Sequence, residues 1–315
     1  MRVLVTGAAG FIGSNTAELL VSQGHEVVAL DNLSSGRREN IPTGAEFVEG
    51  DCGNRDLVTT LGPFGACVHF AAFIEPSESM KRPEAFFSNN VASTFRLLEA
   101  LVEMGVPRFV FSSSCAVYGN QTQMPIDEDR PVNPQSPYGQ TKSMVEDGLR
   151  WMSERGRMNA ASLRYFNAAG ASTLHPERHV PETHLIPLAL ETAAGRREYL
   201  EVFGSDYETL DGTCVRDYVH VSDLAEAHVL TIDALSTTAS LTLNLGTGVG
   251  SSNRQVVEAV RHVTGVNIDV RYTARREGDP AAAVADGRRA QKVLGWQPSR
   301  SDLIAIVTDA WAQVR

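Results

Sequence analysis

Short apolar runs alternate with amphipathic segments through the first half of the chain. Six runs have the length and apolar character of buried parallel strands, and they cover residues 2–7, 25–31, 45–51, 66–72, 108–114 and 159–167. Apolar residues at helical spacing mark residues 11–24, 84–105 and 136–156. Because strands that alternate with helices favour right-handed crossovers, this half predicts an α/β fold built on a doubly wound parallel sheet.

Beyond about residue 167 the pattern becomes irregular. The apolar runs shorten, and helical spacing returns near residues 221–235, 253–264 and 300–314. We therefore expect a smaller C-terminal lobe that is interleaved with the main sheet, without a clear linker between them. The predicted division gives residues 1–166 to the sheet domain, with later returns near 215–247, and residues 167–315 mainly to the second lobe.

Composition narrows the possible function classes. The 315 residues are 43% hydrophobic and 21% charged, which is typical of a globular protein. A net charge of -10 argues against a general nucleic-acid or anionic-membrane binder, and no apolar run is long enough to span a bilayer. Cys52, Cys67, Cys115 and Cys214 form no CxxC pair. We expect reduced thiols, no metal site and a cytoplasmic protein.

A glycine turn joins the first strand to the first helix. Gly7, Gly10 and Gly13 give the segment GAAGFIG a GxxGxxG spacing. Glycine at these positions lets a pyrophosphate approach the backbone, and the helix N-terminus supplies free N–H groups and a positive dipole end. The turn predicts a dinucleotide site. The alternative is a tight strand–helix connection that binds no ligand.

Two acids follow the second and third strands. Asp31 ends the second strand, where a carboxylate can accept hydrogen bonds from the adenosine ribose and would repel a 2′-phosphate. This favours NAD over NADP, although Arg37 and Arg38 lie close enough in sequence to hold that phosphate. Asp51 follows the third strand and is placed either to touch the adenine or to cap its own loop.

A tyrosine, a lysine and a serine form the candidate proton-transfer group. Tyr138 and Lys142 are four residues apart, so they share one face of a predicted helix, and Ser114 ends the fifth strand at the ligand-binding edge of the sheet. A nearby ammonium and a positive nicotinamide would lower the tyrosine pKa from its free value of about 10. The set is suited to taking a proton from an alcohol while a hydride leaves the same carbon. The alternative is a buried tyrosine beside a solvated lysine.

Three motifs together resemble the extended short-chain dehydrogenase/reductase family: GAAGFIG, FSSSCAVYG and SPYGQTK. Further segments follow the order found in its UDP-glucose 4-epimerase subgroup, namely LDNLSSG, VHFAA, NNVASTFRLLEA, LRYFNAAGA, DGTCVRDYVHVSDLAEAH, NLGTGVG and RREGDP. The resemblance runs from Arg2 to about Trp296. It implies a Rossmann-like NAD domain, a UDP-sugar lobe, and C4 epimerisation of UDP-galactose to UDP-glucose through a transient 4-keto sugar.

The resemblance also implies roles for individual residues. Tyr138 would be the base, Lys142 its pKa-lowering partner, and Ser114 a ligand of the sugar oxygen. The implied NAD site comprises Gly7, Gly10, Phe11, Ile12, Gly13, Asp31, Asn32, Ser35, Gly36, Asp51, Cys52, Phe70, Ala71, Ala72, Asn89, Tyr138, Lys142 and Phe166. The implied UDP-sugar site comprises Ser114, Asn167, His184, Leu185, Phe203, Arg216, Arg276 and Asp279. Two arginines suit a pyrophosphate, and a carboxylate suits ribose hydroxyls.

The chain departs from the family pattern at three positions. Ile74 stands where relatives often carry a lysine, so one cofactor contact is expected to be missing. His184 replaces an asparagine that would touch the substrate, and its alternative is a loop histidine. Ala283 stands where some members carry a bulky tyrosine, and its small side chain should leave room for an N-acetyl group at C2 of the sugar. Arg275, next to Arg276, is expected to be a solvated surface residue.

Other functions remain as alternatives. Cys115 and Ala116 stand where the family's dehydratases carry Asp-Glu, so dehydration is not expected, and Cys115 is expected to be a buried thiol. An epimerase of UDP-uronic acids or UDP-pentoses stays open, since His184 or Arg178 could supply a cation for a uronate. A non-catalytic NAD-binding protein is a further alternative, although the complete tyrosine–lysine–serine set argues against it.

Two predicted helices, near residues 84–104 and 137–155, carry apolar residues on more than one face. These residues are Phe86, Phe87, Val91, Leu97, Leu98, Met144, Leu149, Trp151 and Met152. Such helices can pack against a second copy as well as against the sheet, and we expect a homodimer. The alternative is burial on both sides within one chain.

Overall fold

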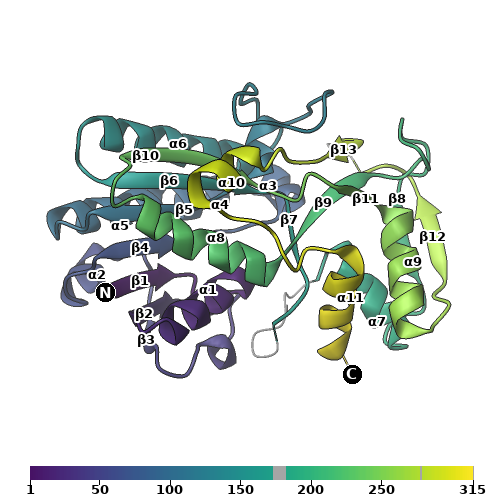
Figure 1. The fold of residues 1–315 in the computed structure, drawn as a ribbon, viewed down its shortest axis with the longest axis horizontal. Coiled ribbons are helices and arrows are strands. Elements are labelled where there is room, and N and C mark those ends of the chain that lie inside the picture. The colour runs from purple at the N-terminus through teal and green to yellow at the C-terminus, as the bar shows by residue number, and fades with distance from the viewer. Residues whose placement is uncertain (173–181, 277–278, 315) are drawn as a thin grey trace.

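The structure, a computed structural model, describes residues 1–172, 182–276 and 279–314. Its largest part is a seven-stranded parallel sheet with helices on both faces (Figure 1). The strands are β1 (Arg2–Thr6), β2 (Glu26–Asp31), β3 (Glu46–Glu49), β4 (Ala66–His69), β5 (Arg108–Ser114), β6 (Asn159–Tyr165) and β10 (Ser240–Leu245). The predicted α/β fold with a doubly wound parallel sheet is confirmed.

The strand order creates the binding edge. It runs β10-β6-β5-β4-β1-β2-β3, so the chain first builds outward from β1 to β3 and then returns to add β4 on the other side of β1. Connections leave β1 and β4 in opposite directions, which opens a crevice at the carboxyl ends of these two strands. The glycine turn follows β1 at this crevice.

Alternating side chains of β1 pack into two apolar layers. Val3 and Val5 face the layer of α1 (Phe11–Ser22), α8 (Val221–Ala234) and α10 (Arg288–Leu294). Leu4 faces the layer of α2 (Arg55–Thr60), α5 (Ser93–Glu103) and α6 (Pro137–Glu154). Burial on both sides explains why the strands are continuous apolar runs rather than alternating ones.

The smaller lobe lies at one end of the sheet, on the right in Figure 1. Its helices α7 (Leu185–Ala193), α9 (Asn253–Thr264) and α11 (Leu303–Ala312) share an apolar core with the two-stranded sheet of β8 (Leu200–Phe203) and β12 (Val270–Thr273). A further sheet consists of β7 (Asn167–Ala169), β9 (Val215–His220), β11 (Gly250–Ser252) and β13 (Ala282–Ala283). The predicted helices near 221–235, 253–264 and 300–314 are confirmed by α8, α9 and α11.

The predicted single helix over residues 84–105 is wrong in one respect. The segment contains α4 (Pro83–Phe86), a π-helical stretch η2 (Phe87–Ala92) and α5. Asn90 lies in the wider turn and is buried. Its amide accepts a hydrogen bond from Phe73 N at 2.8 Å and donates to Phe73 O at 2.9 Å. The π turn thus fixes the loop between β4 and α3 (Pro76–Lys81).

Two single turns of 3-10 helix complete the elements of the described residues. One is η1 (Arg38–Asn40), in the connection from β2 to β3, and the other is η3 (Cys115–Tyr118), directly after β5. The Ser114 side chain caps η3 by accepting a hydrogen bond from Ala116 N at 3.2 Å. Ser114 is therefore held at the end of β5, at the ligand-binding edge of the sheet.

Candidate active site

One cavity of about 1930 Å³ lies between the main sheet and the smaller lobe. It is lined by the carboxyl ends of the central strands, the glycine turn, the start of α6 and residues of α7, β8 and β9. Each residue that the sequence predicts for the cofactor or substrate site lines this cavity. Residues far apart in sequence are thus brought together as expected, and Ile74 and Ala283 line the same cavity.

Two glycines of the turn have no room for a side chain. Gly7 has φ +67°, and a Cβ there would lie 2.6 Å from Ala71 N. A Cβ at Gly13 would lie 2.1 Å from Gly7 O. The helix α1 begins after Gly10 without a side-chain cap. Its first N–H groups are therefore available to an anion that approaches the turn, which is the arrangement that a dinucleotide pyrophosphate requires.

Asp31 is fixed beside this turn. Its two carboxylate oxygens accept hydrogen bonds from Ala9 N at 2.9 Å and Leu33 N at 2.8 Å. Burial raises the pKa of Asp31, and the two backbone hydrogen bonds act against that rise. Leu33 adopts φ +56°, a left-handed conformation that is unusual for a leucine. The turn after β2 thus holds a carboxylate at the cavity wall, where ribose hydroxyls could donate to it.

The adenosine end of the predicted NAD site has further polar groups. Asp51 Oδ1 accepts a hydrogen bond from Gly53 N at 2.6 Å, so this carboxylate caps its own loop while it also lines the cavity. Burial raises the pKa of the Cys52 thiol to about 12, which keeps it uncharged. Arg38 lies over Phe47 and 3.7 Å from Glu49, whereas Arg37 lines the cavity.

Helix α6 places Tyr138 and Lys142. Ser136 caps the helix by accepting a hydrogen bond from Gly139 N, and Pro137 occupies its first turn. Lys142 is buried, and its Nζ donates to Ser112 O at 2.8 Å. This Nζ lies 5.8 Å from the centre of the Tyr138 ring. The spacing of four residues therefore does place the ammonium group beside the phenol.

The protein alone does not lower the tyrosine pKa. Burial raises the pKa of Tyr138 to about 12, and a hydrogen bond with Ser114 acts in the opposite direction. Burial likewise lowers the pKa of Lys142 to about 7, and Glu146 opposes this shift. The sequence-based expectation of a lowered tyrosine pKa is thus not met by the chain by itself, because the loss of hydration outweighs the lowering effect of Ser114.

Arginines of the smaller lobe form the other end of the cavity. Arg216 on β9 donates to the carbonyls of Val215 and Pro280, and its Nη2 lies 3.8 Å from Asp279 Oδ1. The Arg276 guanidinium lies over the Phe203 ring, 4.4 Å from its centre. Two cations, one carboxylate and an aromatic ring thus meet within one site. Such a set can bind a pyrophosphate together with a ribose and a flat base.

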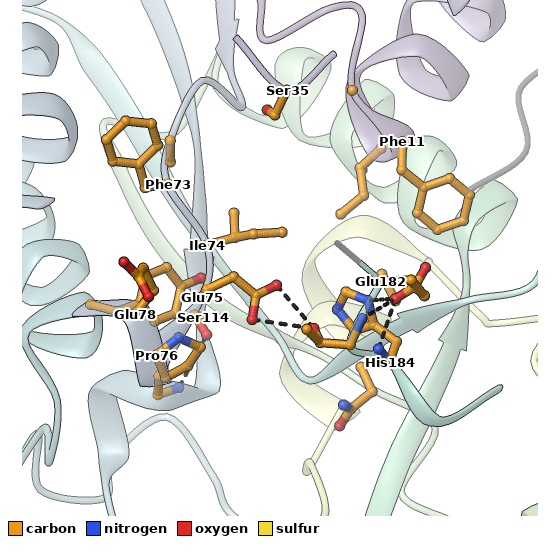
Figure 2. A pocket seen from close by; sticks show the side chains of 18 of the residues that line it. Phe11, Ser35, Phe73, Ile74, Glu75, Pro76, Glu78, Ser114, Glu182 and His184 are labelled. Atoms are coloured by element: carbon orange, nitrogen blue, oxygen red, sulfur yellow. Dashed lines mark hydrogen bonds and ion pairs between the residues drawn. The ribbon is translucent and has the colours of Figure 1, made fainter. Parts of the chain in front are cut away.

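Arg275 and His184 have partners of their own. Arg275 Nε donates to Asp206 at 2.8 Å on the surface, as expected of a solvated residue. His184 Nδ1 lies 2.8 Å from Glu182 Oε1, and it lines the cavity (Figure 2). His184 therefore does not present an uncompensated cation to a substrate. Arg178, the other cation considered for a uronate, lies outside the described residues.

The sequence patterns did not identify Glu75 and Thr183. The Thr183 hydroxyl donates to both carboxylate oxygens of Glu75, at 3.1 and 3.2 Å, and both residues line the cavity. Glu75 comes shortly after β4, so its position near the carboxyl edge of the sheet was the available signal. Thr183 shows no comparable signal, since it lies in an irregular segment before α7.

The described residues are 1–172, 182–276 and 279–314. Within those ranges no cluster of three or more His, Cys, Asp or Glu side chains could hold a metal ion. No helix in the same ranges is both long and apolar enough to cross a membrane.

Known proteins are similar to this chain over nearly its full length. A UDP-glucose 4-epimerase of Streptomyces lividans is 48% identical over 314 residues, which cover 98% of this chain and 95% of that protein. The crystal structure of UDP-glucose 4-epimerase from Brucella ovis in complex with NAD has a TM-score of 0.96 at 44% identity, and the match covers 99% and 98% of the two chains.

A second solved structure is similar to the same extent. It is the UDP-glucose-4-epimerase from Stenotrophomonas maltophila with bound NAD and formylated UDP-arabinopyranose, with a TM-score of 0.96 at 40% identity and a match that covers 100% and 98% of the chains. Residues 3–246 of the present chain match the model of the NAD dependent epimerase/dehydratase family. Since that match spans more than half of the sequence, the chain belongs to the NAD dependent epimerase/dehydratase family.

Proposed function

We propose that the protein epimerises C4 of a UDP-hexose with NAD, converting UDP-galactose to UDP-glucose through a transient 4-keto sugar. The observation that carries this function is the position of Tyr138, Lys142 and Ser114 in one cavity, together with the glycine turn and Arg216 and Arg276. The names of the similar full-length proteins support the same activity. UDP-uronic acids and UDP-pentoses are the less favoured alternatives.

The residues of the first crevice fit NAD. Gly7 and Gly13 leave the backbone open where side chains would clash, and the uncapped start of α1 can receive the pyrophosphate. Asp31 would accept the adenosine ribose hydroxyls, and its charge disfavours the 2′-phosphate of NADP. When bound, NAD supplies a positive nicotinamide ring and both accepts and returns the hydride at C4.

Tyr138 is assigned the proton transfer. As a phenolate it would take the proton from the sugar O4, and as a phenol it would return the proton after the sugar has turned over. Ser114, which lowers the pKa of the phenol, would hold the same oxygen and relay the proton. Because burial raises the tyrosine pKa, the phenolate requires a neighbouring positive charge, and Lys142 is held in place by Ser112 O to supply part of it.

The UDP and the hexose parts of the substrate are proposed to bind in different ways. Arg216, Arg276 and Asp279 are assigned to the UDP, where charged hydrogen bonds anchor it firmly. The hexose must instead be held loosely, since it has to present both faces of C4 to the cofactor. The small side chain of Ala283 lines the cavity, and it supports a second substrate pair with an N-acetyl group at C2.

We further assign the NAD domain to residues 1–166, with returns near 215–247, and most of the UDP-sugar lobe to residues 167–315. A cytoplasmic location and a homodimer belong to the same proposal. Exposed apolar side chains on α6 support the dimer, since Met144 is 40% and Trp151 52% exposed. Both residues lie on the helix that carries Tyr138 and Lys142.

The activity is tested with purified protein and no added NAD. UDP-galactose and UDP-N-acetylgalactosamine are supplied separately, and the C4 epimers are followed by chromatography. We expect turnover of both substrates, since the cofactor must stay bound through the cycle. Turnover of UDP-galactose alone would remove the inference from Ala283. Absence of turnover even with added NAD would contradict the UDP-hexose assignment.

A further inference from the structure

Glu75 reaches across the cavity instead of capping its own helix. It occupies the N-cap position of α3, yet its side chain accepts no hydrogen bond from that helix. Both carboxylate oxygens instead accept the Thr183 hydroxyl, at 3.1 and 3.2 Å. Figure 2 shows this contact between the loop after β4 and the segment that also carries Glu182 and His184. Glu75 therefore stands at a point where the two sides of the pocket meet.

The loop that carries Glu75 is fixed against the helix of Tyr138. Asn90 bonds both backbone groups of Phe73, and its Nδ2 also donates to Thr141 Oγ1 on α6 at 3.2 Å. In α3, which follows Glu75 directly, Ser79 Oγ accepts a hydrogen bond from the backbone N–H of Tyr138 at 3.1 Å. Anchors on both sides of Glu75 thus hold its carboxylate on the side of the cavity where Tyr138 lies.

Among the residues that the structure describes, Glu75 has no cationic partner. None of the ion pairs in the described parts of the chain includes it, and Thr183 is a neutral donor. The segment from Phe70 to Ser79 contains two acids and neither lysine nor arginine. Burial is the main cause that raises the pKa of Tyr138, and the negative charge of Glu75 adds to that rise. Glu75 therefore contributes negative charge near the place where the hexose would react.

We propose that Glu75 is a specificity-determining residue, whose carboxylate keeps nucleotide sugars with an acidic hexose out of the pocket. The inference rests on the proposed function, which places the hexose beside Tyr138. A uronate carries a carboxylate where the neutral hexose has its C6 hydroxymethyl group. Two carboxylates repel each other strongly in a partly buried site. A neutral hexose meets no such repulsion, and its hydroxyl groups can donate to Glu75.

The matched ligands for a test are UDP-glucose and UDP-glucuronate, which differ only at C6. Their dissociation constants are measured by calorimetry on the purified protein with NAD present. The variant Glu75→Gln keeps the size of the side chain and its ability to bond Thr183, but it removes the charge. We expect Glu75→Gln to tighten binding of UDP-glucuronate about tenfold relative to UDP-glucose.

Two further variants separate charge from shape. Thr183→Val removes the hydroxyl tether but keeps the carboxylate, so it should retain the preference for UDP-glucose. Glu78→Gln removes a carboxylate of the same segment that already lies 3.3 Å from Lys81 Nζ, and it should leave the ratio of dissociation constants unchanged.

Three results would overturn the assignment of Glu75. They are an unchanged ratio in Glu75→Gln, an equal change in Glu78→Gln, or loss of UDP-glucose binding in Glu75→Gln, which would mean that Glu75 holds the neutral sugar. Binding can be measured whether or not the protein epimerises its ligand. With turnover, the constant for UDP-glucose applies to its equilibrium mixture with UDP-galactose, whose composition in solution no variant changes. A protein that discriminates between the two ligands but epimerises neither UDP-galactose nor its N-acetyl analogue would contradict the proposed function and leave the role of Glu75 intact.

Discussion

Burial sets the protonation of Tyr138 and Lys142 before a ligand binds. The pKa of the tyrosine is raised to about 12 and that of the lysine is lowered to about 7, since both charged forms lose their hydration. The chain alone therefore favours the phenol over the phenolate. A positive ring bound beside the pair would favour the phenolate. This makes proton removal depend on the oxidised cofactor, as a cycle without net redox change requires.

At the same scale, neighbouring arginines are predicted to differ in function. Arg276 stacks on Phe203 in the cavity, whereas Arg275 pairs with Asp206 on the surface. We expect Arg276→Ala to raise the KM for UDP-galactose about tenfold or more with a smaller change in kcat, because a charged hydrogen bond to the UDP is lost. Arg275→Ala is the matched control. Steady-state kinetics that show equal KM values for the two variants would contradict the assignment.

Most candidate site residues could be predicted from sequence because they belong to local motifs. The spacing of Gly7 and Gly13, and of Tyr138 and Lys142, reflects contacts within one turn or one helix. The bond between Glu75 and Thr183 joins residues 108 positions apart, so no local spacing reveals it. The rise in the pKa of Tyr138 was missed for a similar reason. Distant segments of the chain bury the phenol, and the sequence alone does not show that burial.

At the scale of elements, His69 joins the two strands beside the crevice. It ends β4, and its ring nitrogens lie 2.6 Å from Thr6 Oγ1 on β1 and 2.9 Å from Thr94 Oγ1 on α5. Burial lowers the pKa of His69 to about 3, with a smaller effect of Lys142 in the same direction. The neutral imidazole is therefore part of the packed structure at the switch point of the sheet.

This burial predicts loss of stability in acid. Below pH 6.5, the ordinary pKa of histidine, His69 is protonated in the unfolded chain but stays neutral in the folded chain. The free energy of unfolding should thus fall as the pH drops from 6.5 toward 3, by up to about 1.4 kcal/mol per pH unit for this group. His69→Gln should show a shallower fall in urea unfolding between about pH 7 and about pH 5. His262→Gln, at an exposed site, should keep the full slope, and equal slopes would refute the prediction.

The long elements were predictable and the short ones were not. Buried strands such as β1 and β5 read as apolar runs, and α6 shows its helical period over 18 residues. The helices α2 and α3 have six residues each, too few to display that period. The π turn at Asn90 was also missed, because it depends on hydrogen bonds to Phe73, a residue of another loop.

At the scale of the whole molecule, the cavity exists only because two lobes meet. The sheet domain contributes the glycine turn and helix α6, which carries Tyr138. The smaller lobe contributes Arg216 and Arg276. In Figure 1, β7 and β9 lie between the large sheet and the right-hand helices. Irregular segments of the second half thus acquire their positions from long-range pairing, such as β7 with β9, which no local pattern shows.

A dimer is also predicted at the scale of the whole molecule. Met144 and Trp151 lie on α6 with large exposed fractions, and they are expected to be covered by a second copy. Light scattering should give the mass of two chains, and Trp151→Glu should reduce it toward one. Leu210→Glu, at an exposed apolar residue of the other lobe, serves as the control. A wild-type mass of one chain would exclude the dimer.

The most direct test of the proposed chemistry removes one oxygen atom. Tyr138→Phe keeps the ring and the packing of α6 but lacks the hydroxyl that would carry the proton. We expect its kcat for UDP-galactose to fall by about 10²-fold or more while UDP binding is retained, and Tyr272→Phe, at a surface strand, to match the parent. A Tyr138→Phe variant that epimerises UDP-galactose as fast as the parent would show that the proton moves by another route.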